Sequence, residues 1–159
     1  MEEILEFLLQ YGYVILILFS FTGGYFGMIA AGFLVSLGKM DLTLVLIITS
    51  VSNFLGDYLL FTYVSFIKKF FKKDYRRIIK RYSRKVAYTK VLIRKKGVYG
   101  MFMQKYIKIV RTLYPIVLAT MGYNKKKFFI LNIFASISWS VSIILPSYFF
   151  APYIMGLFK

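Results

Sequence analysis

Three cations interrupt an apolar stretch of this 159-residue chain: Lys105, Lys108 and Arg111 lie between Val98 and Met121. A cation in the hydrocarbon core of a bilayer costs roughly 2.5–3.5 kcal/mol on insertion scales, so three without a purpose are not expected there. On a continuous helix they would fall at i, i+3 and i+6 and form one basic stripe. The stripe indicates either a polar cavity that receives an anionic group or a tilted interfacial helix whose long side chains reach the headgroups.

The composition predicts an integral membrane protein with a single membrane domain over residues 1–159. Hydrophobic residues make up 59% of the chain, aromatic residues 20%, and the mean hydropathy is +0.66. The chain has no cysteine and no histidine, which excludes disulfides, thiol nucleophiles, imidazole bases and the usual zinc or haem ligands. Of its six carboxylates three, Glu2, Glu3 and Glu6, crowd the N-terminus. We therefore expect no enzymatic activity, no cofactor and no metal.

The net charge of +16 is concentrated in one segment, because 14 of the 22 lysines and arginines lie between Lys68 and Lys96. Apolar chain on both sides of this segment is typical of a cytoplasmic loop under the positive-inside rule and argues against nucleic-acid binding. We therefore expect a protein of the cell (inner or plasma) membrane with this segment in the cytoplasm. Cations repeating from Arg76 to Lys85 fit an amphipathic helix on an anionic lipid leaflet, or equally a solvated connector.

The hydropathy pattern predicts an all-α polytopic fold with about three full spans, two oppositely oriented re-entrant hairpins and the basic amphipathic helix. The 13-residue apolar stretch that contains Gly27 and Gly32 is too short to cross about 30 Å of hydrocarbon at 1.5 Å per residue. We expect these glycines, and Pro115 in the cationic stretch, to break their helices. Paired broken helices of opposite orientation are typical of transporters. The expected spans are 4–21, 42–67 and 128–150, the re-entrant segments 23–38 and 98–121, and the basic segment 68–96.

Re-entry of residues 98–121 from the cytoplasm also keeps the three lysines at 125–127 on the same side as the basic segment. If residues 98–121 crossed fully, those lysines would face outward, against the charge bias. The last span is expected to carry no charge and to end near Pro146 and Pro152.

Asp57 is the one carboxylate expected deep in a span, with Asn53 one helical turn before it on the same face. An isolated buried carboxylate loses its charge or finds a partner, so we expect Asp57 to pair with Lys105 or Arg111. Such a pair could be structural or could serve coupling and gating. Phe61 and Val64 of the same span are expected in hydrophobic surroundings.

Motifs along most of the chain, roughly residues 23–148, resemble those of the DedA (VTT-domain, SNARE-associated) family of integral membrane proteins. The resemblance is strongest in the second half, at Gly97-Val98-Tyr99-Gly100, Lys105-Tyr106, Arg111-Thr112-Leu113-Tyr114-Pro115, Phe128-Phe129-Ile130-Leu131-Asn132 and Trp139. In the first half it rests on Ala31-Gly32-Phe33-Leu34 and Gly56-Asp57.

The resemblance implies two opposed re-entrant hairpins and transport of lipids: bacterial members move undecaprenyl phosphate or phosphatidylethanolamine, and distant eukaryotic relatives scramble phospholipids. The family's two essential arginines fall on Lys105 and Arg111. We therefore expect a flippase-like or scramblase-like transporter that binds a phospholipid or polyprenyl-phosphate headgroup at Lys105, Lys108 and Arg111. The alternatives are a non-transporting scaffold that binds anionic lipid or an acidic partner, and an ion or small-solute pathway. A homo-oligomer is compatible with either transport or scaffolding.

Supporting positions follow from the same motifs. Asn132 is expected either to tie helices together or to contact substrate, and the aromatic side chains to pack or to lie at the membrane interface. The supporting residues are Asn53, Tyr106, Thr112, Pro115, Asn132 and Trp139.

The chain departs from the family pattern at three places. Lysine at position 105 keeps the charge of the family's arginine but loses the bidentate fork that suits a phosphate. The family's Pro-Gly pair falls on Lys108 and Ile109. Residues 13–26 hold no carboxylate, whereas family members usually carry the presumed proton-coupling acids there. We therefore expect downhill lipid exchange without proton coupling.

Overall fold

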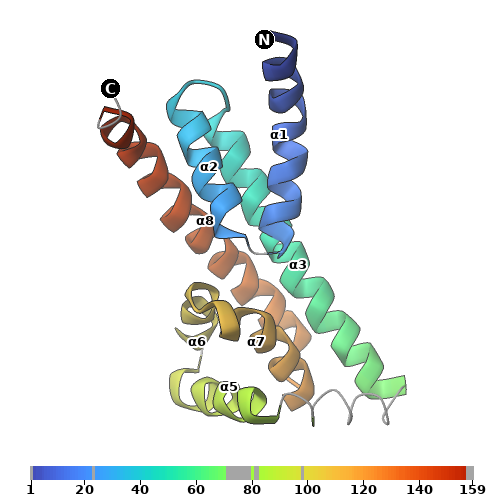
Figure 1. Cartoon of the computed structure of the whole chain (residues 1–159). Coiled ribbons are helices and arrows are strands. Elements are labelled where there is room, and N and C mark those ends of the chain that lie inside the picture. The colour runs from blue at the N-terminus through green and yellow to red at the C-terminus, as the bar shows by residue number, and fades with distance from the viewer. Residues whose placement is uncertain (1, 23, 71–79, 81–82, 98, 157–159) are drawn as a thin grey trace. The chain divides into compact units, whose positions relative to one another are not determined.

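The computed structural model describes residues 2–22, 24–70, 80, 83–97 and 99–156, and every regular element within them is helical (Figure 1). The expectation of an all-α fold is confirmed for this part of the chain. The elements are α1 (Glu2–Thr22), α2 (Tyr25–Ser36), α3 (Leu42–Phe70), α5 (Ser83–Lys96), α6 (Tyr99–Met103), the 3₁₀-helix η1 (Gln104–Tyr106), α7 (Lys108–Met121) and α8 (Lys125–Gly156).

The helices form two compact units with separate hydrophobic cores. The first unit comprises residues 1–55 and 136–159, and the second comprises residues 56–135. Helices α3 and α8 contribute to both units, whereas α1 and α2 belong to the first and α5, α6, η1 and α7 to the second.

In the first unit, α1 and α2 lie side by side and run in opposite directions (Figure 1). The chain leaves α1 after Thr22, as expected from the glycine pair, and the amide of Gly24 donates to the carbonyl of Phe19 at 2.6 Å. The core contains apolar residues of α1, α2, the turn after α2, α3 and α8. Its buried members are Leu16, Met28, Ala31, Val35, Met40, Val45, Trp139 and Ile144.

The glycines of α2 pack the helix instead of breaking it, so the expected interruption at Gly27 and Gly32 is wrong. A β-carbon on Gly32 would lie 2.6 Å from Cβ of Ser147 and 3.0 Å from the carbonyl oxygen of Ile144, both in α8. The missing side chain therefore allows close approach of two helices, which offsets the roughly 1 kcal/mol propensity cost of glycine. Helix α8 likewise continues through Pro146 and Pro152, and its apolar part ends at Tyr153, near the expected end of the last span.

The turn between α2 and α3 follows local turn chemistry. Gly38 adopts the left-handed conformation with φ of 68°, which favours glycine because it has no β-carbon. Asp41 then caps α3, because its Oδ1 accepts a hydrogen bond from the amide of Leu44 at 2.9 Å. The expected turn over residues 38–41 is confirmed.

In the second unit, α5 packs on α6 and α7, and the core joins them to α3 and α8. The ring of Phe61 stacks on Phe128 with centroids 4.2 Å apart, and Val64 packs against this core. The hydrophobic surroundings expected for Phe61 and Val64 are therefore confirmed. Lys68 lies in the last turn of α3 and donates from Nζ to the carbonyl of Thr120 at 2.7 Å, which places a cation at the negative C-terminus of α7.

The expected basic amphipathic helix between Arg76 and Lys85 falls largely outside the described residues, which omit 71–79 and 81–82. The described end of the basic segment is α5, which buries Val86, Thr89 and Ile93 and exposes cations on its other side, including Arg94. The spacing i, i+3, i+7 gives α5 one apolar face against the second unit.

Among the described residues, two helices are apolar and long enough to cross a membrane. They are α3 over Leu42–Phe70, with a mean hydropathy of 1.7, and α8 over Lys125–Tyr153, with a mean hydropathy of 2.0. Each of these stretches has 29 residues. At 1.5 Å per residue each is about 43 Å long and exceeds a hydrocarbon core of about 30 Å. The expected spans 42–67 and 128–150 lie within them. Shorter apolar helices occupy Tyr11–Thr22 and Tyr25–Ser36.

Candidate functional site

The site centres on a buried ion pair between α3 and η1. Nζ of Lys105 lies 2.6 Å from Oδ2 of Asp57, a distance typical of a charge-assisted hydrogen bond. Lys105 is 0% exposed and Asp57 is 7% exposed. The expected pairing of Asp57 with one of the two family cations is therefore present, and Lys105 is the partner.

Arg111 is the third charged residue of the site and is 6% exposed. Across the described residues, Asp57, Lys105 and Arg111 are the only charged side chains that are buried. The positive charges of Lys105 and Arg111 repel each other, whereas Asp57 attracts Lys105. Two cations and one carboxylate give the cluster a formal charge of +1, which one anionic group would neutralise.

A break in the helix positions the two cations. Residues 99–106 form α6 and η1, Ile107 is extended with φ of −105° and ψ of 102°, and α7 starts at Lys108. Lys105 therefore lies before the break and Arg111 in the first turn after it. The three cations do not form the continuous i, i+3, i+6 stripe expected for one helix, because Ile107 reorients the chain between them.

The first turn of α7 adds to the positive potential around Arg111. Helix N-termini present unpaired amide groups and the positive end of the helix dipole, and the first turn of α7 contains no acidic residue. Pro115 lies inside α7, so the expected break there is wrong. Its ring nitrogen has no hydrogen, and therefore the carbonyl of Arg111 lacks the usual helical donor four residues later.

The remaining predicted residues of the second unit differ in their surroundings. Asn132 is fully buried in α8. Tyr106 is 50% exposed and Thr112 is also exposed, so neither belongs to the buried cluster. Lys108 begins α7, but its side chain lies outside the described part of the structure. Its predicted contact with phosphate stays a prediction.

Two predicted supporting residues lie in the first unit. Asn53 is buried and donates from Nδ2 to the carbonyl of Ser20 at 3.5 Å, an amide contact between α3 and α1. Trp139 is fully buried and meets the ring of Tyr25 edge-on, with centroids 5.6 Å apart. Both contacts are typical of helix packing, and for Trp139 packing was one of the two expectations for the aromatic side chains.

Tyr114 lies one turn after Arg111 and is only 1% exposed, which agrees with a packing role for this aromatic side chain. Its hydroxyl donates to the carbonyl of Gly97 at 3.4 Å and thereby links α7 to the turn between α5 and α6. Tyr114, Gly97 and Arg94 also line a cavity of about 320 Å³ in the second unit.

The described residues form an all-helical fold with two apolar helices long enough to cross a membrane and a buried cationic site. The family model of the VTT domain matches residues 12–149, and the chain belongs to this family, also called DedA or SNARE-associated. The family consists of membrane proteins and is not known for enzymatic activity. No curated protein and no solved structure matches the chain.

Proposed function

We propose that this protein transports lipid in the manner of a flippase or scramblase and moves the headgroup of a phospholipid or polyprenyl phosphate across the bilayer. The observation that carries the proposal is the buried pair of Lys105 and Asp57 with buried Arg111 across a helix break. Membership of the VTT domain family, whose members have been proposed as transporters, supports the same class.

In the absence of lipid, Asp57 holds Lys105 and lowers the cost of burying its charge. An entering phosphate competes with Asp57 for the Lys105 ammonium and binds the guanidinium of Arg111, which suits phosphate oxygens in a bidentate geometry. The headgroup is then partly neutralised while the acyl chains stay in lipid. Its desolvation cost falls at the depth where an unpaired phosphate would be most unfavourable.

Helix lengths support a re-entrant arrangement of residues 98–121. Helix α7 has 14 residues and is about 21 Å long, which is too short to cross about 30 Å of hydrocarbon. We propose that α6, η1 and α7 form one hairpin and that residues 23–38 contribute the other, with opposite orientation. A non-helical backbone at membrane depth requires protein around it, and the buried surroundings of Lys105 and Arg111 provide such cover.

The basic segment 68–96 would face the cytoplasm of a cell membrane and contact its anionic lipids. The exposed cations of α5 support this placement. The lysines at 125–127, which are exposed at the start of α8, would lie on the same side.

The proposal is tested in proteoliposomes that contain a fluorescent phospholipid, with a membrane-impermeant reductant that bleaches only the outer leaflet. Wild-type protein should make nearly all of the probe accessible, and Arg111→Ala should stop this exchange because the buried guanidinium is lost. Lys126→Ala, which removes an exposed cation of the same unit, is the matched control and should behave as wild type. Lipid binding without any exchange by the wild type would favour the scaffold and overturn the proposal.

A further inference from the structure

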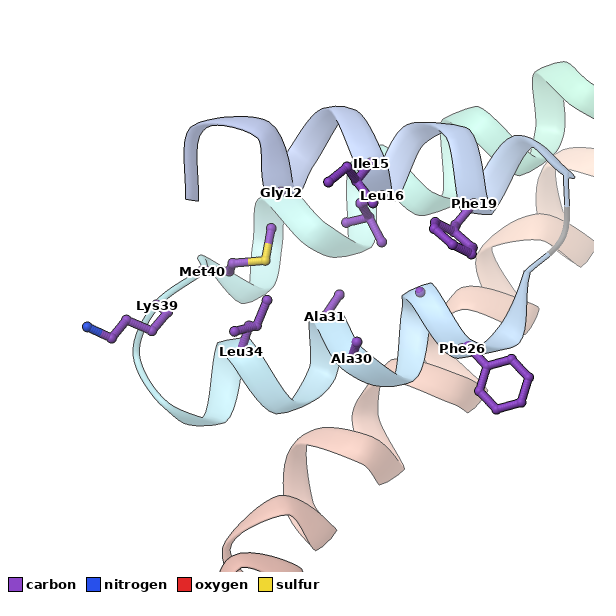
Figure 2. A pocket seen from close by; sticks show the side chains of 11 residues that line it. Gly12, Ile15, Leu16, Phe19, Phe26, Ala30, Ala31, Leu34, Lys39 and Met40 are labelled. Atoms are coloured by element: carbon purple, nitrogen blue, oxygen red, sulfur yellow. The ribbon is translucent and has the colours of Figure 1, made fainter. Parts of the chain in front are cut away.

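A groove between α1 and α2 in the first unit has no role in the proposed transport site. It encloses about 440 Å³, within the range of small-ligand pockets. Figure 2 shows the side chains of α1 and α2 that face one another across it. Small residues on both walls, Gly12 of α1 and Ala30 of α2, leave the space, and the lining is apolar apart from one lysine.

One end of the groove is closed by an aromatic ring. Phe19 of α1 lies against the backbone of Gly27, where an added β-carbon would be 2.6 Å from Cβ of Phe19 (Figure 2). Because the ring fills the space between the helices there, the groove is a slot with a blind apolar end near the break between α1 and α2.

The other end carries a cation. Lys39 lies in the turn after α2 and projects away from the helices (Figure 2). It is the only lysine or arginine among the described residues of the first unit and forms no ion pair with any of them. The nearby carboxylate of Asp41 is engaged in capping α3 through Leu44. Lys39 is therefore available to an external anion.

The length of the slot matches one leaflet. Helix α2 has 12 residues and is about 18 Å long, close to half of a hydrocarbon core of about 30 Å. With Lys39 at the headgroup level, the blind end at Phe19 reaches about the depth at which an acyl chain ends. The groove walls at Ile15 and Ala30 are exposed, so the slot opens to surrounding lipid.

We propose that this groove binds one acyl chain of an anionic phospholipid, whose phosphate pairs with Lys39. The apolar lining fits a hydrocarbon chain, and the single cation at the open end selects a headgroup of negative net charge. This lipid site lies on α1 and α2 and uses none of the residues assigned to headgroup transport. The proposed lipid site requires that the protein lies in a membrane, but it does not require that the protein transports lipid.

Native mass spectrometry of the full chain, titrated with phosphatidylglycerol or phosphatidylcholine, tests the apolar slot. Ala30→Phe and Gly12→Leu each place a larger side chain in the groove, the first from α2 and the second from α1. Each variant should bind one tightly held phosphatidylglycerol molecule fewer than the wild type. Leu18→Phe is the matched control, because Leu18 is 62% exposed on α1 and does not line the groove. Thermal unfolding of each variant identifies any that misfold, and two independent filling variants keep the test decisive.

Lys39→Gln should weaken binding of this phosphatidylglycerol about fivefold, with little change for phosphatidylcholine, because a surface lysine near anionic lipid contributes an effect of that order. Lys39→Arg should retain the affinity, and Lys126→Gln controls for net charge. Equal lipid retention by the Ala30→Phe and Leu18→Phe variants would overturn the site. An unchanged affinity in Lys39→Gln would overturn the anionic headgroup, and a changed oligomeric state in Ala30→Phe would show that a second copy covers the groove instead.

Discussion

At the level of single residues, the protein must keep two cations buried. Asp57 and Lys105 form an ion pair at 2.6 Å, and Arg111 is buried beside the same helix break. Removing one partner of a buried pair leaves an uncompensated charge, whereas removing both leaves the net charge of the cluster unchanged. In the proposed mechanism, the pair has a structural role in the absence of lipid and becomes exchangeable only when a second anion is present.

The first prediction is that Asp57→Asn destabilises the protein by about 3–5 kcal/mol, because Lys105 is left charged and unpaired in the interior. The double variant Asp57→Asn/Lys105→Met should recover most of that loss. Reversible unfolding in mixed micelles measures both free energies. Equal stability of the single and double variants would contradict a direct interaction between the two side chains.

A second prediction concerns the energy source of exchange. Asp57→Asn should change the exchange rate without creating or removing dependence on a pH gradient, because residues 13–26 lack the presumed coupling acids. Exchange rates in proteoliposomes with and without a collapsed gradient measure this. If wild-type exchange stops when the gradient collapses, the uncoupled mechanism is wrong.

At the scale of elements, the helix break at Ile107 and the turns around it decide where the charges lie. The break does not coincide with a glycine or proline, whereas Gly27, Gly32, Pro115 and Pro146 all lie within helices. In apolar helices, packing and neighbouring backbone compensate for these residues. A glycine with positive φ, such as Gly38, has a different role. Its replacement is unfavourable because a residue with a β-carbon rarely adopts that backbone conformation.

The third prediction separates these two uses of glycine. Gly38→Ala should destabilise by about 1–2 kcal/mol, because its φ of 68° is unfavourable for an L-residue although no atom lies within 4 Å of the added carbon. Gly32→Ala should cost more, since its new carbon would meet Ser147 at 2.6 Å and backbone atoms of α8 within 3.2 Å. Thermal unfolding ranks the two variants, and a larger loss for Gly38→Ala would contradict the assignment.

Sequence predicted some elements better than others for physical reasons. The turn at residues 38–41 was predictable because its glycine is a strong local signal. The pairing of Asp57 was predictable because a buried carboxylate needs a cationic partner. The break at Ile107 was not placed, since an isoleucine carries no local signal for a helix end and tertiary contacts override helix propensity. Burial of Tyr114 agrees with one of the two expectations for the aromatic side chains, but an apolar helix gives no clear inner face from its sequence that would have decided between packing and the membrane interface.

At the level of the whole molecule, the proposed transport site is compatible with only one membrane topology of the basic residues. The segment 68–96 and the lysines at 125–127 should lie on the same side of the membrane if residues 98–121 enter and return. The chain has no cysteine, so single cysteines can be introduced without prior removal of native ones.

The fourth prediction is that Lys95→Cys and Lys126→Cys are both modified by a membrane-impermeant thiol reagent from the cytoplasmic side only. Both positions are exposed, so access depends on topology and not on burial. Right-side-out and inside-out vesicles give the comparison. Modification of position 126 from outside would make residues 98–121 a crossing segment and would contradict the re-entrant arrangement.

The most direct test of the central claim compares two lipids with the same acyl chains in the same proteoliposomes, one with a phosphate headgroup and one a neutral glycolipid. Because Lys105 and Arg111 are proposed to bind phosphate, wild-type protein should exchange the phospholipid much faster than the glycolipid. Arg111→Ala should abolish that preference together with phospholipid exchange. Equal exchange of both lipids by the wild type, or an unchanged phospholipid preference in Arg111→Ala, would contradict a phosphate site at the buried cations.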